Sequence, residues 1–442
     1  MNIKYVKIFA NWIVDLARVE LQKFQRITCL LHLCNKFVPV KSISNYIIRI
    51  EEGNIAIAIK TIKAYCRSNT KSLIVAQICE ADKIFGYLIL LIFAPIAAAS
   101  ELVHADHLVL FVVSAIALIP LAKLIGDSTE HLATYYGPTA GSLLNVTFGN
   151  AAEIIIAVVA ISAGLLDLVK ASITGAIIGN ILLILGLSVI AGGFRFKEQT
   201  FSRENVGIQA SMLFLAIIGL AVPTILVSTI PSSSENQGQV QLLSDALAFI
   251  LLIVYILGIV FTFITHKHLF TPPPESTEDI HESHGHSTHW SKKKSFLFLA
   301  ASMAGVIVVS EILVASVETT GEELGFGELF VGAIIVGIVG NAAEHSSAIL
   351  LARKGKMELS IGIAAGSGTQ IALFVVPILV FAGIAMGQPF TLVFTLLELG
   401  VLFLGAIILN LIVHDGRSNW FEGVMLTAVY IIIAIAFFFV AD

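Results

Sequence analysis

Long apolar segments separated by short polar stretches recur along the chain from residue 84 to its C-terminal end. A transmembrane helix needs about 20 mostly apolar residues to cross the hydrocarbon core of a bilayer. The pattern therefore predicts an all-α membrane protein with 11 transmembrane helices. They are expected at residues 84–102, 108–125, 141–165, 171–191, 206–227, 243–265, 296–317, 329–352, 359–385, 392–413 and 420–440.

Basic residues lie almost entirely in alternate connections between these segments. Cytoplasmic connections of membrane proteins are enriched in Lys and Arg. One set of predicted connections holds a single basic residue, Lys170. The other set holds Lys123, Arg195, Lys197, Arg203, Lys267, Lys292, Lys293, Lys294, Arg353, Lys354, Lys356 and Arg417. This alternation supports the helix count and predicts a cytoplasmic N-terminus.

A five-residue motif occurs twice within the apolar segments. Gly-Asn-Ala-Ala-Glu occupies residues 149–153 and returns at residues 340–344. A charged side chain at the bilayer centre costs about 2.5–3.5 kcal/mol on insertion scales. Two acids in duplicated apolar settings therefore indicate a paired site for a cation, shared between two related halves of the chain.

The duplication divides the predicted helices into an isolated first helix and two sets of five. An odd number of helices in each repeat gives the two halves opposite orientations, the inverted-repeat arrangement of secondary transporters. Glu130 and Glu311 occupy similar Ser-containing contexts in the two halves, and residues 175–180 parallel residues 362–367. The predicted divisions are residues 1–83, a basic extension; 84–103, the first helix; 104–265, the first repeat; 266–294, a linker; and 295–442, the second repeat.

Composition excludes a soluble globular protein, because 57% of the 442 residues are hydrophobic and 13% are charged. Soluble domains carry about 25% charged residues. All four cysteines lie between residues 29 and 79, with no spacing typical of a disulfide framework or a metal site. The basic segments of residues 1–83 could lie on a membrane surface or form a cytoplasmic extension.

The repeated motif supplies the ligand types that a hard cation prefers. Gly, Ala and Asn weaken the helix locally, and a broken helix frees backbone carbonyl oxygens. Ca²⁺ binds 6–8 oxygen ligands at about 2.3–2.6 Å. Glu153 and Glu344 would supply two negative charges for one divalent ion, and Asn150 and Asn341 would supply further oxygens.

The same two carboxylates could carry protons in the opposite direction. When the cation leaves, two carboxylates held close together at low dielectric favour proton uptake. Competition between Ca²⁺ and H⁺ for Glu153 and Glu344 would then couple the two flows without a further device. In the alternative interpretation, Gly and Ala are packing residues and each Glu pairs with a buried Lys or Arg. The apolar segments contain almost no basic residue for such a pair.

Three other acids, outside the repeated motif, are candidates for a role in transport. Glu130 and Glu311 could serve ion entry or proton passage, or could face water near a helix end. Glu398 lies inside the predicted segment 392–413 and is a candidate proton relay.

Several neutral polar residues also fall within the spans. His345 could titrate or could pack between helices. Ser367 and Gln370 belong to a polar cluster that could line the cavity and move with a gate, or could form interhelical hydrogen bonds. The linker contains His281, His284, His286 and His289 beside acidic residues, which leaves open a Zn²⁺ or Ca²⁺ sensor or a solvated connection.

These motifs resemble the signatures of the Ca²⁺/H⁺ antiporter (cation exchanger) family. Residues 141–153, Gly-Ser-Leu-Leu-Asn-Val-Thr-Phe-Gly-Asn-Ala-Ala-Glu, resemble its first signature. Residues 340–349 and 366–377 resemble the second, and residues 415–423 match a stretch near the last helix. The resemblance covers residues 84–442. It implies eleven helices with two inverted five-helix repeats after an isolated first helix.

The resemblance also implies roles for individual residues. The family's main Ca²⁺ acids map to Glu153 and Glu344, its other membrane acids to Glu130, Glu311 and Glu398, and its gating glutamine to Gln370. The His-rich linker departs from the family's acidic linker, and residues 1–83 match no part of the family.

The expected function is therefore export of Ca²⁺ from the cytosol in exchange for H⁺, by a transporter and not an enzyme. The expected setting is the lipid bilayer, in the plasma membrane of a prokaryote or the vacuolar membrane of a eukaryote. No cofactor or nucleic acid is expected, and association into a homo-oligomer is left open. The alternatives are a Na⁺/Ca²⁺ exchanger or a Mn²⁺-preferring antiporter, a cation channel and an intramembrane metalloenzyme.

Overall fold

The computed structural model describes residues 90–229, 234–266 and 290–440. The predicted basic extension, the start of the first predicted span and the four linker histidines lie outside these residues. The chain divides into two parts, residues 1–99 and 100–442. The described residues of the first part are 90–99. They include most of a short apolar helix, α5 (Phe93–Leu102).

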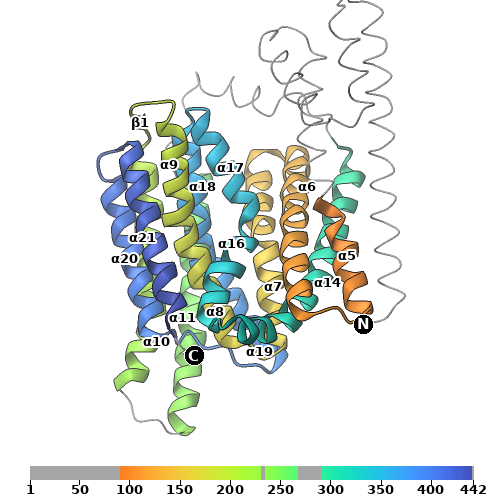
Figure 1. Ribbon diagram of the computed structural model, residues 1–442. Coiled ribbons are helices and arrows are strands. Elements are labelled where there is room, and N and C mark those ends of the chain that lie inside the picture. Colours follow the sequence, from red (N-terminus) through yellow and green to blue (C-terminus); the bar gives the residue numbers. More distant parts are fainter. Residues whose placement is uncertain (1–89, 230–233, 267–289, 441–442) are drawn as a thin grey trace, which may run out of the picture. The chain divides into compact units, whose positions relative to one another are not determined.

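The second part is almost entirely helical (Figure 1). Its α-helices are α6 (His107–Gly149), α7 (Ala151–Ser162), α8 (Leu166–Ile178), α9 (Leu185–Gly193), α10 (Arg203–Thr229), α11 (Ser234–Val260), α14 (Lys292–Leu324), α15 (Glu328–Phe330), α16 (Gly337–Gly340), α17 (Ala342–Arg353), α18 (Met357–Gln370), α19 (Val376–Met386), α20 (Leu396–Val413) and α21 (Trp420–Phe438). Four π-helical turns are η1 (Gly179–Ile184), η2 (Phe261–Thr265), η3 (Val331–Val336) and η4 (Ile371–Val375). Two short strands, β1 (Gln199–Thr200) and β2 (Arg417–Ser418), pair antiparallel.

The described helices confirm the membrane class. Nine of them are long and apolar enough to cross a membrane, and a tenth span forms if the bent pair Glu328–Gly340 and Ala342–Arg353 is counted as one. Each of these corresponds to one of the ten spans predicted after residue 103. The first predicted span is described only from residue 90, so the total of eleven stays a prediction.

The boundary between the first two spans of the second part differs from the prediction. Helical structure continues through α6, yet a Cβ atom on Gly141 would lie 2.7 Å from the backbone oxygen of Ala133. Residues eight apart in a straight helix are separated by about 12 Å. The chain therefore reverses direction here, and the first span runs from His107 to Tyr136 instead of ending at residue 125. Lys123, counted among the cytoplasmic connections although it falls at the end of the predicted segment 108–125, lies well inside this span.

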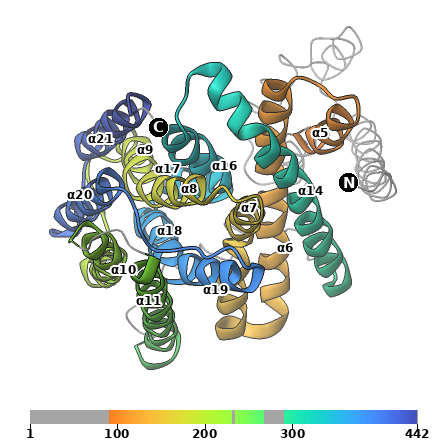
Figure 2. The same ribbon diagram turned by 90° about the horizontal axis from the view of Figure 1, so that it is seen from below.

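Glycines allow the two halves to cross closely at the centre of the molecule. A Cβ atom on Gly175 in α8 would lie 1.8 Å from the backbone oxygen of Ala333 in η3. A Cβ atom on Gly337 in α16 would lie 2.9 Å from the backbone nitrogen of Ala176. Small residues permit such approach between membrane helices. Viewed from below, α8, α17 and α18 occupy the middle, with α6 and α14 on one flank and α10, α20 and α21 on the other (Figure 2).

The turns that follow the two motif helices lie at opposite ends of one span. The α7–α8 turn directly precedes α8, at the start of the continuous segment Leu166–Gly193. The α17–α18 turn lies at the far end of that segment, where the Gly355 Cβ position is 2.9 Å from the Phe196 ring. The strand pair lies at the same end, which we call the basic end because it carries Arg195, Arg353 and Arg417.

The start of α20 also corrects a predicted boundary. The predicted span begins at residue 392, but the helix begins at Leu396. Residues 391–395 are not helical, Leu392 and Phe394 are buried, and side chains of other helices accept from these two backbone N–H groups: Leu392 N–H donates to Ser244 Oγ (3.1 Å), and Phe394 N–H donates to Thr224 Oγ1 (2.9 Å). Leu392, Val393 and Phe394 are apolar, so this non-helical segment was predicted as part of a helix.

Candidate cation site between the two motif helices

The first motif interrupts a helix within the membrane span 143–162. Asn150 separates α6 from α7 and has a non-helical backbone (φ −93°, ψ 15°). Glu153 lies in the first turn of α7, half-buried, with its Cγ atom 3.4 Å from the Cβ position of Gly340 in the second motif. Its Oε2 atom is buried and has no hydrogen-bond partner among the described residues.

The second motif repeats this local geometry. Asn341 separates α16 from α17 with nearly the same backbone angles (φ −95°, ψ 11°), and the two helices meet at 62°. Glu344 lies in the first turn of α17 and interacts electrostatically with Glu153. The two acids that the sequence singled out are therefore brought together from separate halves of the chain.

The two motif asparagines are held by amides from the opposite half. Asn150 Nδ2 donates to Gln370 Oε1 at 2.8 Å. Asn180 Nδ2 donates to Asn341 Oδ1 at 2.9 Å, and Asn341 Nδ2 donates to Gly337 O at 3.1 Å. Asn180 was not among the predicted site residues. The sequence feature that could have identified it is an amide side chain in the middle of an apolar segment.

Both cross-linking amides lie at π-helical turns. Asn180 is the second residue of η1, and Gln370 immediately precedes η4. Single π-helical turns within α-helices are rare and occur frequently at functional sites. Irregular backbone inside a membrane is tolerated where it is buried in protein or lines a cavity. The irregular segments therefore coincide with the candidate site.

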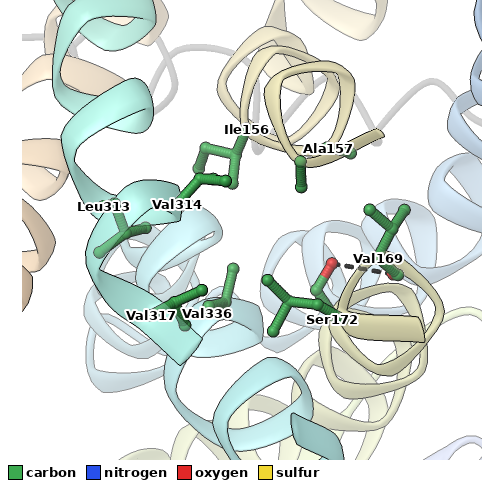
Figure 3. Close-up of a pocket in the computed structure, with 10 residues that line it drawn as sticks. Ile156, Ala157, Val169, Ser172, Leu313, Val314, Val317 and Val336 are labelled. Atoms are coloured by element: carbon green, nitrogen blue, oxygen red, sulfur yellow. Dashed lines mark hydrogen bonds between the residues drawn. The ribbon is translucent and has the colours of Figure 1, made fainter. Parts of the chain in front are cut away.

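A small cavity adjoins Glu153. Its volume is about 30 Å³, and Glu153, Gly337, Gly340 and Asn341 contribute to its wall beside apolar residues of α7, α8 and η4. This space accommodates a water molecule or a single ion. A neighbouring cavity of about 10 Å³ lies between α7, α8 and α14 (Figure 3). Its lining is apolar apart from Ser172, which also lines the first cavity.

Glu398 has a local structural role that the sequence did not reveal. It lies in the first turn of α20, near the start of the span Leu396–Val413, and completes a capping box with Thr395. Glu398 Oε2 accepts from Thr395 N–H (2.8 Å) and Thr395 Oγ1 (2.9 Å), while Oε1 accepts from Thr174 Oγ1 (3.4 Å). Its predicted role as a proton relay is untested by this geometry.

The other predicted residues have varied positions. His345 is buried next to Glu344, and its Nε2 atom has no partner within the described part of the chain. Ser367 is buried in α18, whereas Glu130 and Glu311 have exposed side chains on α6 and α14. None of these four belongs to the set of residues that line the cavity beside Glu153.

Lys123, which the sequence analysis counted among the cytoplasmic connections, has a carboxylate partner on its own helix. Lys123 forms an ion pair with Asp127 one helical turn later, with 3.0 Å between Nζ and Oδ1. The Lys123 ammonium also acts electrostatically on Glu344. The expectation that the apolar segments offer the motif acids almost no basic partner stays a prediction. Within residues 90–229, 234–266 and 290–440, no three His, Cys, Asp or Glu side chains converge as metal ligands.

Comparison with known proteins places this site in context. The family model described as sodium/calcium exchanger protein matches residues 107–264 and 294–439. The chain is 42% identical to a Ca(2+)/H(+) antiporter of Synechocystis sp., over 80% of this chain and 97% of the relative. It is 39% identical to the Ca(2+)/H(+) antiporter ChaA of Bacillus subtilis, over 78% and 96%. The solved structure of native YfkE is similar with a TM-score of 0.68 at 36% identity, covering 80% of this chain and all of YfkE.

Proposed function

Because the chain belongs to the sodium/calcium exchanger protein family, we propose that it is a secondary transporter that exchanges Ca²⁺ for H⁺ across a membrane. The observation that carries this proposal is the meeting of Glu153 and Glu344, each in the first turn of a helix interrupted within the bilayer. The function of the curated relatives, named as Ca(2+)/H(+) antiporters, supports the same exchange.

Glu153 and Glu344 are the proposed Ca²⁺-binding acids. Two carboxylates match the charge of one divalent cation, and the unpartnered Oε2 atom of Glu153 is available to a cation or a proton. Asn150 and Asn341 interrupt their helices beside these acids, and we assign them to the oxygen-rich surroundings of the ion. The cavity beside Glu153 has room for one ion without its hydration shell.

Protons replace Ca²⁺ on the same carboxylates. A protonated carboxyl group is neutral, so the emptied site avoids two unpaired negative charges in a medium of low dielectric. Binding of Ca²⁺ and of H⁺ to Glu153 and Glu344 are then mutually exclusive. Ca²⁺ affinity consequently falls as the pH falls, because protons occupy the acids that the ion needs.

Alternating access follows from the inverted organisation that we infer for the two halves. The α7–α8 and α17–α18 turns lie at opposite ends of the span 166–193. Rocking of one half against the other around a central site would expose the ion to each side in turn. We place the basic end and the N-terminus in the cytosol, in agreement with the positive-inside rule. Ca²⁺ then leaves the cytosol, in the plasma membrane of a prokaryote or the vacuolar membrane of a eukaryote.

The remaining predicted residues are assigned to proton passage and gating. Gln370 accepts a hydrogen bond from Asn150, so a movement of either half would alter the geometry of the ion site directly. Ser367 precedes Gln370 by one turn, and His345 adjoins Glu344. Glu130, Glu311 and Glu398 are proposed to lie along the proton route, outside the ion-binding pair.

The proposal is tested by the substitutions Glu153→Gln and Glu344→Gln, each assayed for proton-driven Ca²⁺ uptake into everted membrane vesicles. Glutamine preserves the shape of the side chain but cannot release a proton or supply a full negative charge. We expect uptake to fall to background in both variants. The exposed Glu204, in the first turn of α10, provides the matched control Glu204→Gln, which should transport like the wild type.

The same vesicles distinguish the other exchange modes. Ca²⁺ uptake should persist without Na⁺ and should collapse when the proton gradient is dissipated. Normal transport in either glutamine variant would contradict the shared-carboxylate mechanism. Uptake driven by a Na⁺ gradient at equal pH on both sides would instead indicate Na⁺/Ca²⁺ exchange.

A further inference from the structure

Gln209 on α10 meets the central helix α18 at the turn that carries Gln370. The Thr369 hydroxyl group has two acceptors within reach, Ala365 O on its own helix at 2.8 Å and Gln209 O at 3.2 Å. A Cβ atom on Gly366 would lie 3.6 Å from Gln209 Oε1. Viewed from below, α18 lies between α10 and α7 (Figure 2). Gln209 therefore contacts the polar end of α18 on the side that faces away from α7.

The side-chain oxygen of Gln209 is a buried acceptor. Gln209 Nε2 donates to Asn205 Oδ1 at 3.5 Å, one turn earlier on α10, which leaves Oε1 directed at α18. Among the described residues, no group donates to this Oε1 atom, and solvent does not reach it. A buried acceptor without a partner costs free energy and is rare in native proteins. A donor that reaches Gln209 in another conformation would account for it.

Gln370 is the amide that can reach this oxygen. Residues 366 and 370 are four positions apart, so they share one face of α18, and helical side chains lean toward the N-terminal turn. The Gln370 side chain can therefore lie over Gly366, where the Gln209 oxygen is the one contact within 4 Å of the Cβ position. In this structure Gln370 Oε1 accepts from Asn150 at 2.8 Å. Its amide nitrogen is a donor and matches the acceptor of Gln209.

We propose that Gln209 is the second partner of Gln370. In the state that opens to the other side of the membrane, the Gln370 side chain leaves Asn150, turns along α18 and donates from Nε2 to Gln209 Oε1. This exchange releases Asn150 beside Glu153 and keeps the Gln370 amide paired inside the membrane, where an unpaired polar group is costly. The inference rests on the proposed Ca²⁺/H⁺ exchange and deepens it. Gln209 acts through Gln370, so it is a positioning residue of the ion site.

Gln209→Met tests this role, because methionine is a flexible side chain of similar length without a strong acceptor. The maximal rate of proton-driven Ca²⁺ uptake into everted vesicles should fall about five- to tenfold, the effect of one hydrogen bond lost from one of two states. Equilibrium binding of radioactive Ca²⁺ to the purified full chain should not weaken, because the state with Gln370 on Asn150 is unaffected. The melting temperature in detergent should not fall, since the substitution removes a buried acceptor that has no partner in this state.

Two further variants and one control sharpen the test. Gln209→Glu keeps an acceptor oxygen at this position and should restore the rate. Gly366→Ala fills the space that the Gln370 side chain crosses, so it should slow uptake; its Cβ atom lies at an ordinary contact distance from Gln209, so stability should not change. Gln241 on α11 is also half-buried, its Oε1 atom lacks a partner within the described chain, and it donates to Asp245 one turn away. Gln241→Met should transport like the wild type.

The outcomes separate this inference from the proposed function. A wild-type protein that neither binds nor transports Ca²⁺ would overturn the proposed function. Where the wild type transports Ca²⁺, an unchanged uptake rate in Gln209→Met would overturn only the second-partner role. Slower uptake with a lower melting temperature and no recovery in Gln209→Glu would also overturn it, because a residue that merely packs α10 against α18 would behave in this way.

Discussion

At the scale of single residues, the site is held together by amides that cross between the two halves. Asn180 donates to Asn341, and Asn150 donates to Gln370. Each hydrogen bond joins a motif asparagine to the span that follows the other motif. Asn180 and Asn341 are almost fully buried, so breaking this bond leaves a polar group without water to replace its partner.

Asn180→Leu tests the importance of this crossing. The substitution leaves the buried Asn341 amide oxygen without its donor, at a cost of about 1–3 kcal/mol. We expect a lower melting temperature in detergent and a loss of most Ca²⁺ uptake, because Asn341 directs the break that positions Glu344. Asn410 provides the control, since within the described part of the chain its side chain donates to Ala406 O on its own helix. A transport rate in Asn180→Leu equal to that of Asn410→Leu would show that the cross-link is dispensable.

At the scale of helices, the close crossing of the two halves depends on particular glycines. The sequence places glycines in two parallel pairs, at residues 175 and 179 and at residues 362 and 366. Only Gly175 meets backbone atoms of the other half at very short distance, and Gly179 and Gly362 have open space at their Cβ positions. Spacing alone predicts a packing face but does not say which glycine the neighbouring helix meets.

Gly175→Ala should therefore be damaging where Gly362→Ala is tolerated. An alanine at 175 would place Cβ against the Ala333 backbone, and the helices would have to separate. We expect about 1–3 kcal/mol of destabilisation, typical of overpacking. Ca²⁺ uptake should also fall, because the displaced η3 leads directly into the second motif. Thermal melting and vesicle uptake of both variants provide the comparison. Equal stability of the two variants would contradict the close crossing.

Hydropathy predicted the spans well, and its errors have physical causes. The span beginning at His107 was predicted to end eleven residues too early because Lys123, Asp127 and Glu130 lower its apolar character. Lys123 and Asp127 neutralise each other, and a pairing of this kind cannot be seen in a hydropathy profile. The start of α20 was placed too early for the opposite reason, since a non-helical apolar segment was read as helix.

The sequence predicts the site residues that occur in both copies of the motif. It does not predict residues whose role comes from a contact between the two halves. Glu153 and Glu344 stand out because the same acidic motif occurs twice in apolar surroundings. Asn180 is not duplicated, since Ser367 stands at the equivalent position of the second half, and its role follows from the crossing of α8 with η3 and α16. The sequence therefore identifies the acids of the site, while the structure identifies what holds the motif helices in place.

At the scale of the whole molecule, the structure places the two motif turns at opposite ends of one span. The basic end carries the strand pair and an exposed salt bridge between Glu198 and Arg417 at 2.9 Å. An exposed bridge of this kind contributes about 0–1 kcal/mol, so the strand pair and helix packing carry more of the stability at this end. The opposite end carries Lys170 near the α7–α8 turn.

Cysteine labelling tests this two-ended organisation in the membrane. The four native cysteines lie between residues 29 and 79 and can be replaced by serine. Single cysteines are then introduced as Ala163→Cys, beside the α7–α8 turn, and Lys354→Cys, in the α17–α18 turn, where both native side chains are exposed. A membrane-impermeant maleimide should label Lys354→Cys in everted vesicles and Ala163→Cys in right-side-out vesicles, because the basic end faces the cytosol.

Each variant must retain Ca²⁺ uptake, so that labelling reports the working transporter. Labelling of both positions from the same side would exclude inverted halves, whereas opposite sides in the reverse order would preserve the inverted organisation and reverse the direction assigned to transport.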